Sequence, residues 1–308
     1  SKWYSRDLRQ WIRDFGPDVL FFASGDYQFA YDIAYRISCD FDIPMIMYCC
    51  DDYYINRLNP HALLSRPIHS NLMRSVRKCV SRSVGIITIC DKLTEAYKEL
   101  FDCPIYTVYT GSSTAGEENP GGKGIVYLGN LGYQRQKSLV DIGRALKRIS
   151  AKTGEQLYLD VYSGESREEI LRDLTEDNGI IFHGSVDSSE VNKIISESRL
   201  VVHTESFEPE NIYKVQYSIS TKIADLLASG HCILAYGPDN IASMEYLQDN
   251  HAACVVNDRA RLEVELERIL SDREERCRIV QNAKALAEKN HRREMVSLKV
   301  TQIMETVR

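Results

Sequence analysis

Long apolar segments are missing from the sequence. It has no run of 18 apolar residues, which is about the minimum for a membrane-spanning helix. Near its start the charged residues Arg6, Arg9, Arg13 and Asp14 lie among apolar positions, a pattern unlike that of a secretory signal peptide. Hydrophobic residues are 44% of the 308 residues and charged residues 27%, as in ordinary globular proteins. We therefore expect a cytoplasmic protein.

Metal-binding and redox motifs are also missing. The chain has nine cysteines, but no C-x-x-C pair and no cysteine–histidine spacing typical of a metal site. The adjacent Cys49 and Cys50 are expected to pack as small apolar residues. We interpret the cysteines as reduced, mostly buried thiols and expect no metal site.

Acidic residues are absent between Tyr53 and Cys90, although the net charge of the chain is −6. Six basic residues lie in this stretch: Arg57, Arg66, Arg74, Arg77, Lys78 and Arg82. The last four have the spacing of a stripe along a helix. One interpretation is a solvated face balanced by acidic surface elsewhere. The other is a surface, Arg57–Arg82, that contacts an anionic membrane at its inner face or a phosphate-bearing lipid acceptor. Nucleic acid is not expected, because no recognition module appears.

Short β-type runs alternate with helical runs through both halves of the chain. The expected strands of the first half are Val19–Phe22, Met45–Tyr48, Ile86–Ile89 and Ile105–Val108. Those of the second half are Ile125–Leu128, Leu157–Tyr162, Ile180–His183, Leu200–His203, Cys232–Tyr236 and Ala253–Val256. This alternation predicts an α/β fold with mainly parallel sheets.

A polar linker separates the two halves. Residues Ser112–Lys123 are small and polar and contain Pro120 and several glycines. Single cores rarely grow beyond about 250 residues, so a chain of this length predicts two domains. We place the first at residues 1–115 and the second at 116–290, and we expect a helix over 291–308 to return to the first domain.

The most informative stretch is Ser218–Pro238. It indicates an amphipathic helix that carries Lys222 and Asp225 on one face, ends at a glycine and leads into a short strand. Upstream, the expected strand Leu200–His203 is followed closely by Glu205. Ligands of open α/β sheets bind at the carboxyl ends of strands. These polar side chains are therefore predicted to converge on one crevice.

This pattern resembles the donor-binding half of GT-B glycosyltransferases, especially the large retaining family (family 4-like) that has a Glu-x7-Glu motif. Glu205–Phe207 is similar to the Glu-Gly-Phe part of that motif, and Asp225–Gly230 is similar to its Glu-Ala-x-Ala-x-Gly part. Lys222 matches a lysine found in one branch of the family. The two acidic residues lie twenty positions apart here instead of eight, so we expect Glu208–Tyr217 to loop out.

The resemblance implies a GT-B fold of two Rossmann-like domains. Because the chain opens on a helical stretch, Trp3–Phe15, we expect its N-terminal acceptor domain to be incomplete. The resemblance further implies a nucleotide diphosphate-sugar as donor, a glycan or lipid-linked acceptor, and no required metal or other cofactor.

A glycine turn, Gly129–Gly132, joins a strand to a helix that carries Arg135 and Lys137. The N–H groups of such a turn and of a helix N-terminus favour phosphate, and a nearby cation neutralises it. In the family an arginine stands where this chain has Asn130, so we expect Arg135 to replace it. By the resemblance, Lys137 and Lys222 also face the departing diphosphate. The glycine spacing alone is compatible with any strand–helix turn.

The resemblance assigns the other donor contacts. A carboxylate at Asp225 would accept hydrogen bonds from ribose hydroxyls, and the alternative is a salt bridge with Lys222. Glu205 would contact the donor sugar, and the alternative is an ordinary cap or loop carboxylate. The remaining assigned positions are Ser206 and Phe207 beside the donor, and Gly184, Ser185 and Val186 at the nucleotide base.

In the first half, Asp51 and Asp52 follow the expected strand Met45–Tyr48. Paired carboxylates at the end of a strand could orient an acceptor hydroxyl or remove its proton, so we assign a catalytic role to Asp51. A helix-capping role for this residue is an equal alternative.

These observations favour an enzyme, a glycosyltransferase of hexosyltransferase type. The resemblance implies that it acts with retention in cell-surface polysaccharide synthesis. Electrostatic stabilisation of the leaving diphosphate would supply much of its catalysis. The main alternative is a non-catalytic nucleotide-sugar-binding or glycan-assembly protein on the same fold. A third is an epimerase or a phosphorylase of GT-B type.

Overall fold

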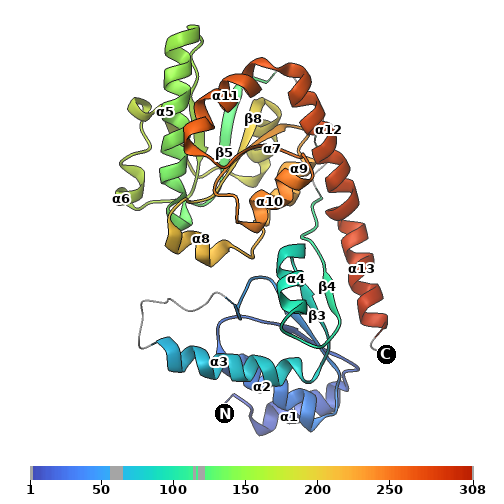
Figure 1. Ribbon diagram of the computed structural model, residues 1–308. Helices are drawn as coiled ribbons and strands as arrows, with labels where there is room; N and C mark the ends of the chain where they lie inside the picture. The colour runs from blue at the N-terminus through green and yellow to red at the C-terminus, as the bar shows by residue number, and fades with distance from the viewer. Residues whose placement is uncertain (1–2, 56–64, 114–115, 117–121, 307–308) are drawn as a thin grey trace. The chain divides into compact units, whose positions relative to one another are not determined.

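The computed structural model describes residues 3–55, 65–113, 116 and 122–306 (Figure 1). The chain divides into two compact units. The first comprises Ser1–Thr110, Tyr217–Ile219 and Glu294–Arg308, and the second Gly111–Gln216 and Ser220–Arg293. Arg57 of the basic stretch and part of the predicted linker lie outside the described residues.

The first unit is built on a parallel sheet with the strand order β1-β2-β3-β4. Its strands are β1 (Leu20–Ala23), β2 (Met45–Cys49), β3 (Ser83–Thr88) and β4 (Ile105–Thr107). Its helices are α1 (Arg6–Phe15), α2 (Gln28–Asp40), α3 (Ser65–Val80), α4 (Asp91–Lys98) and, from the C-terminal end of the chain, α13 (Arg293–Glu305). Ile303 of α13 packs against Ile46 and Ile87 of the sheet, so the last helix belongs to this core.

The second unit contains a six-stranded parallel sheet with the order β10-β9-β8-β5-β6-β7. Its strands are β5 (Gly124–Leu128), β6 (Leu159–Tyr162), β7 (Ile180–Gly184), β8 (Ser198–Thr204), β9 (Cys232–Tyr236) and β10 (Cys254–Val256). Its α-helices are α5 (Arg135–Thr153), α6 (Glu168–Leu171), α7 (Ser188–Ser196), α8 (Pro209–Val215), α9 (Lys222–Ala228), α10 (Ala242–Asp249), α11 (Leu262–Ser271) and α12 (Arg273–Asn290). Its described part also contains short 3-10 turns at Gly132–Gln134, Glu176–Asn178 and Arg259–Arg261.

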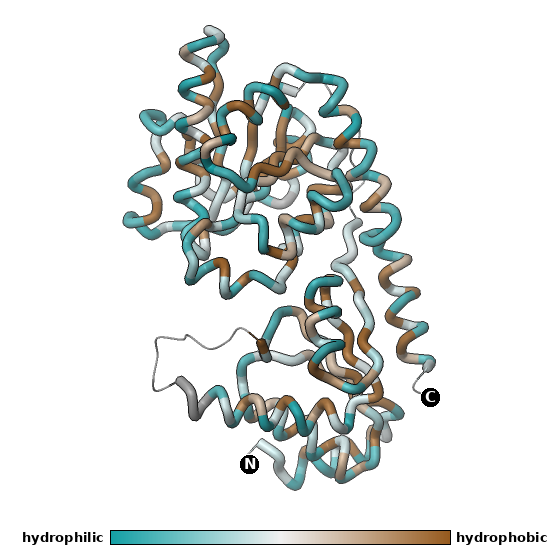
Figure 2. Tube along the Cα trace, viewed as in Figure 1, coloured by the Kyte–Doolittle hydropathy of each residue, from teal (hydrophilic) through white to brown (hydrophobic). Residues whose placement is uncertain are grey.

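The central strands β5, β8 and β9 form the core of the second unit, because parallel strands that are covered on both faces bury most of their residues. Every residue of β9 is buried. Figure 2 shows the same strands as a largely hydrophobic layer inside a shell of mixed helices. Leu139, Ile142 and Leu146 of α5 pack on this layer together with residues of α11 and α12.

The order of the strands creates a switch point between β5 and β8. From β5 the chain builds β6 and β7 on one side, and it then returns to place β8 on the other side of β5. The loops that leave β5 and β8 therefore diverge at their carboxyl ends, where doubly wound sheets bind their ligands. The glycine turn follows β5, and Glu205 follows β8.

The predicted α/β class and its two Rossmann-like parallel sheets are confirmed. The expectation that Glu208–Tyr217 loops out is wrong, because Pro209–Val215 forms α8, with proline at its start. None of the helices in the described parts of the chain combines the length and apolar character needed to cross a membrane.

Gly143 in the middle of α5 is required by a close backbone contact. A methyl group at this position would lie 2.3 Å from the carbonyl oxygen of Asn178 and 2.7 Å from the side chain of Ile180. Helix propensity alone predicts that Gly143→Ala stabilises the protein by about 1 kcal/mol. We expect the overpacking to reverse this sign, so that chemical denaturation gives a loss of about 1–3 kcal/mol.

Gly164→Ala is the matched control, because a methyl group at Gly164 meets no atom within 4 Å and its φ is not positive. Equal stabilities of the two variants would show that α5 does not need this close approach.

Candidate functional site

A cluster of polar side chains occupies the carboxyl ends of β5 and β8. Its members come from four places in the sequence and meet only in the fold. They are Tyr127 of β5, Arg135 at the start of α5, His203 and Glu205 at the end of β8, and Lys222 at the start of α9.

Arg135 and Glu205 form a buried ion pair. The Nη2 and Nε atoms of Arg135 donate to Oε2 of Glu205 at 2.9 and 3.1 Å, and Nε also donates to the carbonyl of Thr204 at 3.1 Å. Glu205 is only 2% exposed. Burial disfavours the charge of Arg135, but the neighbouring carboxylate outweighs this effect and raises the pKa of the guanidinium. Arg135 is therefore a fixed positive charge.

Lys222 is the second cation of the cluster. Its ammonium lies 5.9 Å from the centre of the Tyr127 ring and directly against Gly129, where a side chain would approach it to 2.2 Å. Burial, followed by the charge of Arg135, lowers the pKa of Lys222 to about 8, while Glu205 acts in the opposite direction. A glycine at position 129 thus leaves room for an ammonium that is poorly solvated.

His203 adds no charge to the cluster. Burial and then the charges of Arg135 and Lys222 lower the pKa of its imidazole to about 3, so it is neutral at physiological pH. Its Nε2 lies 3.5 Å from Oε1 of Glu205 and has no hydrogen-bond partner among the described residues. Burial raises the pKa of Glu205 above its usual range, against the lowering by Arg135 and Lys222. When Glu205 is ionised, the cluster holds two cations and one anion.

The loop from Gly129 to Arg135 is held in a constrained shape. The hydroxyl of Tyr127 donates to the carbonyl of Asn130 at 2.6 Å, and the Asn130 side-chain oxygen accepts from Nη1 of Arg135 at 3.1 Å. Tyr133 and Gln134 both have positive φ, at 57° and 58°, a conformation that non-glycine residues rarely adopt. Such strain persists only where the surroundings enforce it, and it is frequent at functional sites.

Other sequence-predicted residues lie beside the cluster with different partners. Lys137, expected at the diphosphate, forms an exposed ion pair with Glu208 at 3.0 Å. Phe207 packs against Tyr236 with ring centres 4.9 Å apart. Ser206 is buried, and its hydroxyl accepts hydrogen bonds from the Glu208 backbone and the Asn211 side chain. These contacts shape the loop after β8.

Asp225 lies one turn beyond Lys222 on α9. It is exposed, and its Oδ1 accepts a hydrogen bond from the hydroxyl of Ser112 at 2.6 Å. The predicted base-reading loop, Gly184–Val186, begins at the end of β7, which is an edge strand separated from β5 by β6. Gly184 has a φ of 77°, so the turn there suits glycine.

Asp51 belongs to the first unit, where it follows β2. Its carboxylate accepts hydrogen bonds from the hydroxyl of Ser218 and from the backbone N–H of Asp52. Burial raises the pKa of Asp51. The neighbouring Asp52 caps the following turn, because its Oδ1 accepts from the N–H groups of Tyr54 and Ile55 at 2.9 and 2.8 Å. The capping role considered for Asp51 is thus filled mainly by Asp52.

Two members of the cluster were not predicted as site residues from the sequence. Tyr127 is one apolar position in a buried strand, and only its place two residues before the glycine turn could have indicated a role. His203 is the last residue of the expected strand Leu200–His203, and it is buried. Within the described ranges of the chain, no group of three or more His, Cys, Asp or Glu side chains is arranged to hold a metal ion.

The fold matches solved structures of glycosyltransferases. The Anabaena protein HepE, solved with UDP, has a TM-score of 0.73 and 14% identity, over 97% of this chain and 81% of that one. Sucrose-phosphate synthase of Thermosynechococcus elongatus has a TM-score of 0.68 and 12% identity, over 97% and 76%. Trehalose 6-phosphate synthase of Burkholderia multivorans has a TM-score of 0.67 and 13% identity, over 98% and 72%. At these identities the likeness establishes the GT-B fold.

Sequence comparison supplies the family. No curated protein sequence matches the chain. The model of a family described as glycosyl transferase-like matches residues 144–298, which is half of the chain. The chain therefore belongs to the glycosyl transferase-like family and is a glycosyltransferase of GT-B fold.

The charges of the cluster can be tested one at a time through the pKa of Lys222. Glu205→Gln removes a carboxylate that raises this pKa, so we expect the pKa to fall below its value of about 8. An NMR titration of the lysine side chains measures it.

Glu208→Gln is the control, since Glu208 pairs with Lys137 instead. It should leave the Lys222 titration unchanged. A Glu205→Gln variant whose Lys222 titrates as in the wild type would contradict the described cluster.

Proposed function

We propose that this glycosyltransferase uses a nucleoside diphosphate sugar as donor, and that Arg135 and Lys222 bind its diphosphate. The observation that carries the proposal is the excess of positive charge in the cluster. Two partly buried cations share one buried carboxylate, that of Glu205, and charges withdrawn from water are stable only when they are paired. A bound diphosphate would supply the missing negative charge.

The surroundings of the cluster support a phosphate ligand. It lies at the switch point of a doubly wound sheet, next to a glycine turn and the start of α5. The buried side-chain oxygens of Gln134 and Gln136 have no hydrogen-bond partner within the described part of the chain. Such atoms favour a polar ligand nearby, such as sugar hydroxyls. HepE, of the same fold, was solved with UDP and with UDP-glucose.

For the nucleoside we keep the assignments made by resemblance. Asp225 is exposed, and its carboxylate already accepts a hydroxyl hydrogen bond from Ser112, which is the interaction that a ribose hydroxyl would make. The loop Gly184–Val186 would contact the base. The Glu-x7-Glu type of family 4 is part of the same proposal, with Glu205 and Asp225 as its two acidic residues.

The geometry gives Glu205 a supporting role. It was expected to contact the donor sugar, but it is 2% exposed, and both of its oxygens face protein groups, Arg135 and His203. We propose that it orients the Arg135 guanidinium, so that the remaining donors of Arg135 can address phosphate. Asn130, which replaces the arginine of the family pattern, accepts a hydrogen bond from Arg135. The guanidinium of Arg135 thus lies at the place of the arginine in the family pattern. This favours a catalytic protein over a non-catalytic nucleotide-sugar-binding protein.

In the proposed reaction the bond between the anomeric carbon and the β-phosphate oxygen breaks, and a glycosidic bond to an acceptor hydroxyl forms. The acceptor loses its proton, for which Asp51 is the proposed base. Arg135 and Lys222 stabilise the charge that develops on the leaving diphosphate. We propose that these cations make a metal unnecessary and, by the resemblance, that the configuration is retained.

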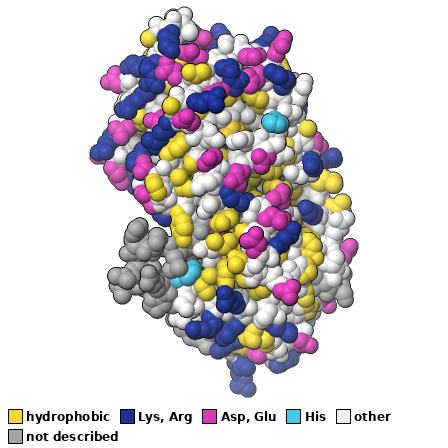
Figure 3. Space-filling model, in the orientation of Figure 1, with side chains coloured by type: hydrophobic (Ala, Val, Ile, Leu, Met, Phe, Trp, Pro, Cys, Tyr) yellow, Lys and Arg dark blue, Asp and Glu magenta, His cyan; other side chains and the backbone are white. Residues whose placement is uncertain are grey.

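The proposed acceptor is a glycan or a lipid-linked sugar in cell-surface polysaccharide synthesis. The basic stretch, of which Arg74, Arg77 and Lys78 are described and exposed, supports contact with a phosphate-rich surface at the inner face of the membrane. In Figure 3, Lys and Arg side chains gather over the part of the first unit that α1, α2 and α3 form.

Two substitutions on α9 separate the roles of the donor groups. Lys222→Ala should weaken UDP much more than uridine, because its ammonium would contact only the phosphates. Asp225→Asn should weaken both, by roughly 1.5–3 kcal/mol, the range for a hydrogen bond to a charged group. Isothermal titration calorimetry with UDP and uridine measures both effects.

Lys193→Ala, which removes an exposed lysine of α7, is the control and should bind UDP as the wild type does. GDP, ADP and dTDP are titrated in parallel to identify the base. If Lys222→Ala leaves the affinity for UDP and for each of the other diphosphates unchanged, the proposed diphosphate site is wrong.

A further inference from the structure

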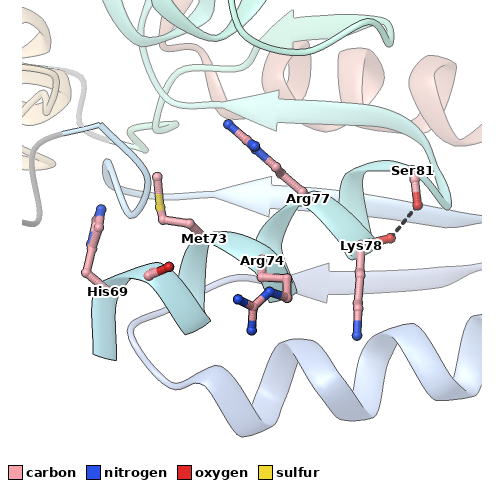
Figure 4. A pocket seen from close by; sticks show the side chains of 7 residues that line it. His69, Met73, Arg74, Arg77, Lys78 and Ser81 are labelled. Carbon is pink, nitrogen blue, oxygen red and sulfur yellow. Dashed lines mark hydrogen bonds between the residues drawn. The ribbon is translucent and has the colours of Figure 1, made fainter. Parts of the chain in front are cut away.

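One surface of the first unit, the hollow along α3, is not used by the donor site. The helix lines a hollow of about 810 Å³. Two rows of side chains, each with the four-residue spacing of a helix ridge, border it. Figure 4 shows His69, Met73 and Arg77 along one edge and Arg74 and Lys78 along the other, with Ser70 and Ser81 completing the lining.

The hollow carries several positive charges that no nearby carboxylate of the described residues neutralises. Arg74, Arg77 and Lys78 lie three and four residues apart, and no carboxylate of the described residues lies within 4 Å of their charged groups. Arg82, by contrast, is paired with Asp42 at 3.1 Å. Like charges at this spacing weaken a helix by a few tenths of a kcal/mol per pair. Arg77 and Lys78 also lie in the last turn, where positive charge is favourable, but Arg74 lies one turn earlier.

Arg77 is held in place by a buried tyrosine. Its Nε donates to the hydroxyl of Tyr54 at 2.7 Å, and its guanidinium lies 5.9 Å from the centre of that ring. Tyr54 is 5% exposed and packs edge-on against Phe101 at 4.8 Å. The two terminal amino groups of Arg77 have no partner among the described residues. This is the fork that binds phosphate in bidentate fashion.

The hollow adjoins the proposed acceptor residues. Tyr54 lies on the loop of Asp51 and Asp52, and its N–H donates to Asp52. Asp52 also acts on His69 at the other end of the hollow: burial lowers the pKa of His69, and the Asp52 charge partly offsets this. The lowered pKa of His69 favours its neutral imidazole, which can donate and accept hydrogen bonds at this end of the hollow.

We propose that the α3 hollow binds the phosphate group of a phosphorylated acceptor, with Arg77 as its main ligand and Arg74 and Lys78 as supporting charges. This inference rests on the proposed function, since it names the chemical class of the acceptor. The hollow is much larger than an inorganic phosphate, and the thioether of Met73 offers an apolar contact, so an organic phosphate suits it. The phosphate could belong to a freely diffusing phosphoester or to a lipid head group.

The test measures phosphate binding separately from donor binding. The full chain is first saturated with UDP, so that the donor site is filled, and geranyl phosphate is then titrated by calorimetry, with geraniol as the uncharged probe. We expect geranyl phosphate to bind and geraniol not to bind. Arg77→Gln should weaken geranyl phosphate about tenfold or more, and Arg74→Gln with Lys78→Gln should weaken it and reduce its salt dependence.

Arg6→Gln is the matched control: it removes one exposed charge from α1 of the same unit and should change nothing. Sedimentation with phosphatidylcholine vesicles, with and without phosphatidylglycerol, identifies the source of the phosphate. Binding of anionic vesicles that Arg77→Gln reduces assigns a lipid head group. Binding of geranyl phosphate without vesicle binding assigns a free phosphoester.

The proposal is overturned if neither probe binds, or if Arg77→Gln binds them as well as Arg6→Gln does. A lower melting temperature of Arg77→Gln with unchanged phosphate affinity would show that Arg77 only stabilises the end of α3. Because UDP affinity is measured in the same samples, loss of geranyl phosphate binding with intact UDP binding is distinguishable from failure of the donor site.

Discussion

The imbalance of two partly buried cations against one buried carboxylate is the physical feature on which the proposed chemistry of the second unit depends. Arg135 is fixed by Glu205, and Lys222 has no carboxylate of its own within the cluster, so its charge remains poorly compensated. An apo protein accepts such an arrangement only at a cost in stability, because unpaired buried charge is unfavourable. A ligand that brings negative charge would remove this cost.

The fold creates this imbalance by bringing distant residues to one edge of a sheet. Arg135 and Glu205 are seventy positions apart in sequence, yet β5 and β8 are neighbours, so the residues that follow them meet. Gly129 leaves space for the Lys222 ammonium, which lies over the ring of Tyr127. His203 stays neutral and so does not disturb the balance of charge. Each of these residues affects the shape or the charge of the cluster, which is the proposed diphosphate site.

The sequence predicted the strands and the site residues whose positions local patterns determine. The strands could be located from their apolar runs, and Arg135, Glu205 and Lys222 from their places next to strand ends and glycine turns. Tyr127 and His203 could not be distinguished from core residues, since their roles depend on neighbours across the sheet. The α8 helix was predicted as a loop because the family spacing made its residues an insertion. Lys137 was placed at the diphosphate by motif position, whereas Glu208 of the same insertion holds it at the surface.

Proton uptake on UDP binding tests whether the diphosphate binds beside Lys222. Calorimetry near pH 8, in buffers of different ionisation enthalpy, counts the protons that the complex takes up. Lys222 is about half protonated there in the free protein, and a nearby diphosphate should raise its pKa. We predict uptake of about half a proton per UDP, an affinity that weakens as the pH rises above 8, and no uptake by Lys222→Met. Binding of UDP without proton uptake would contradict the account.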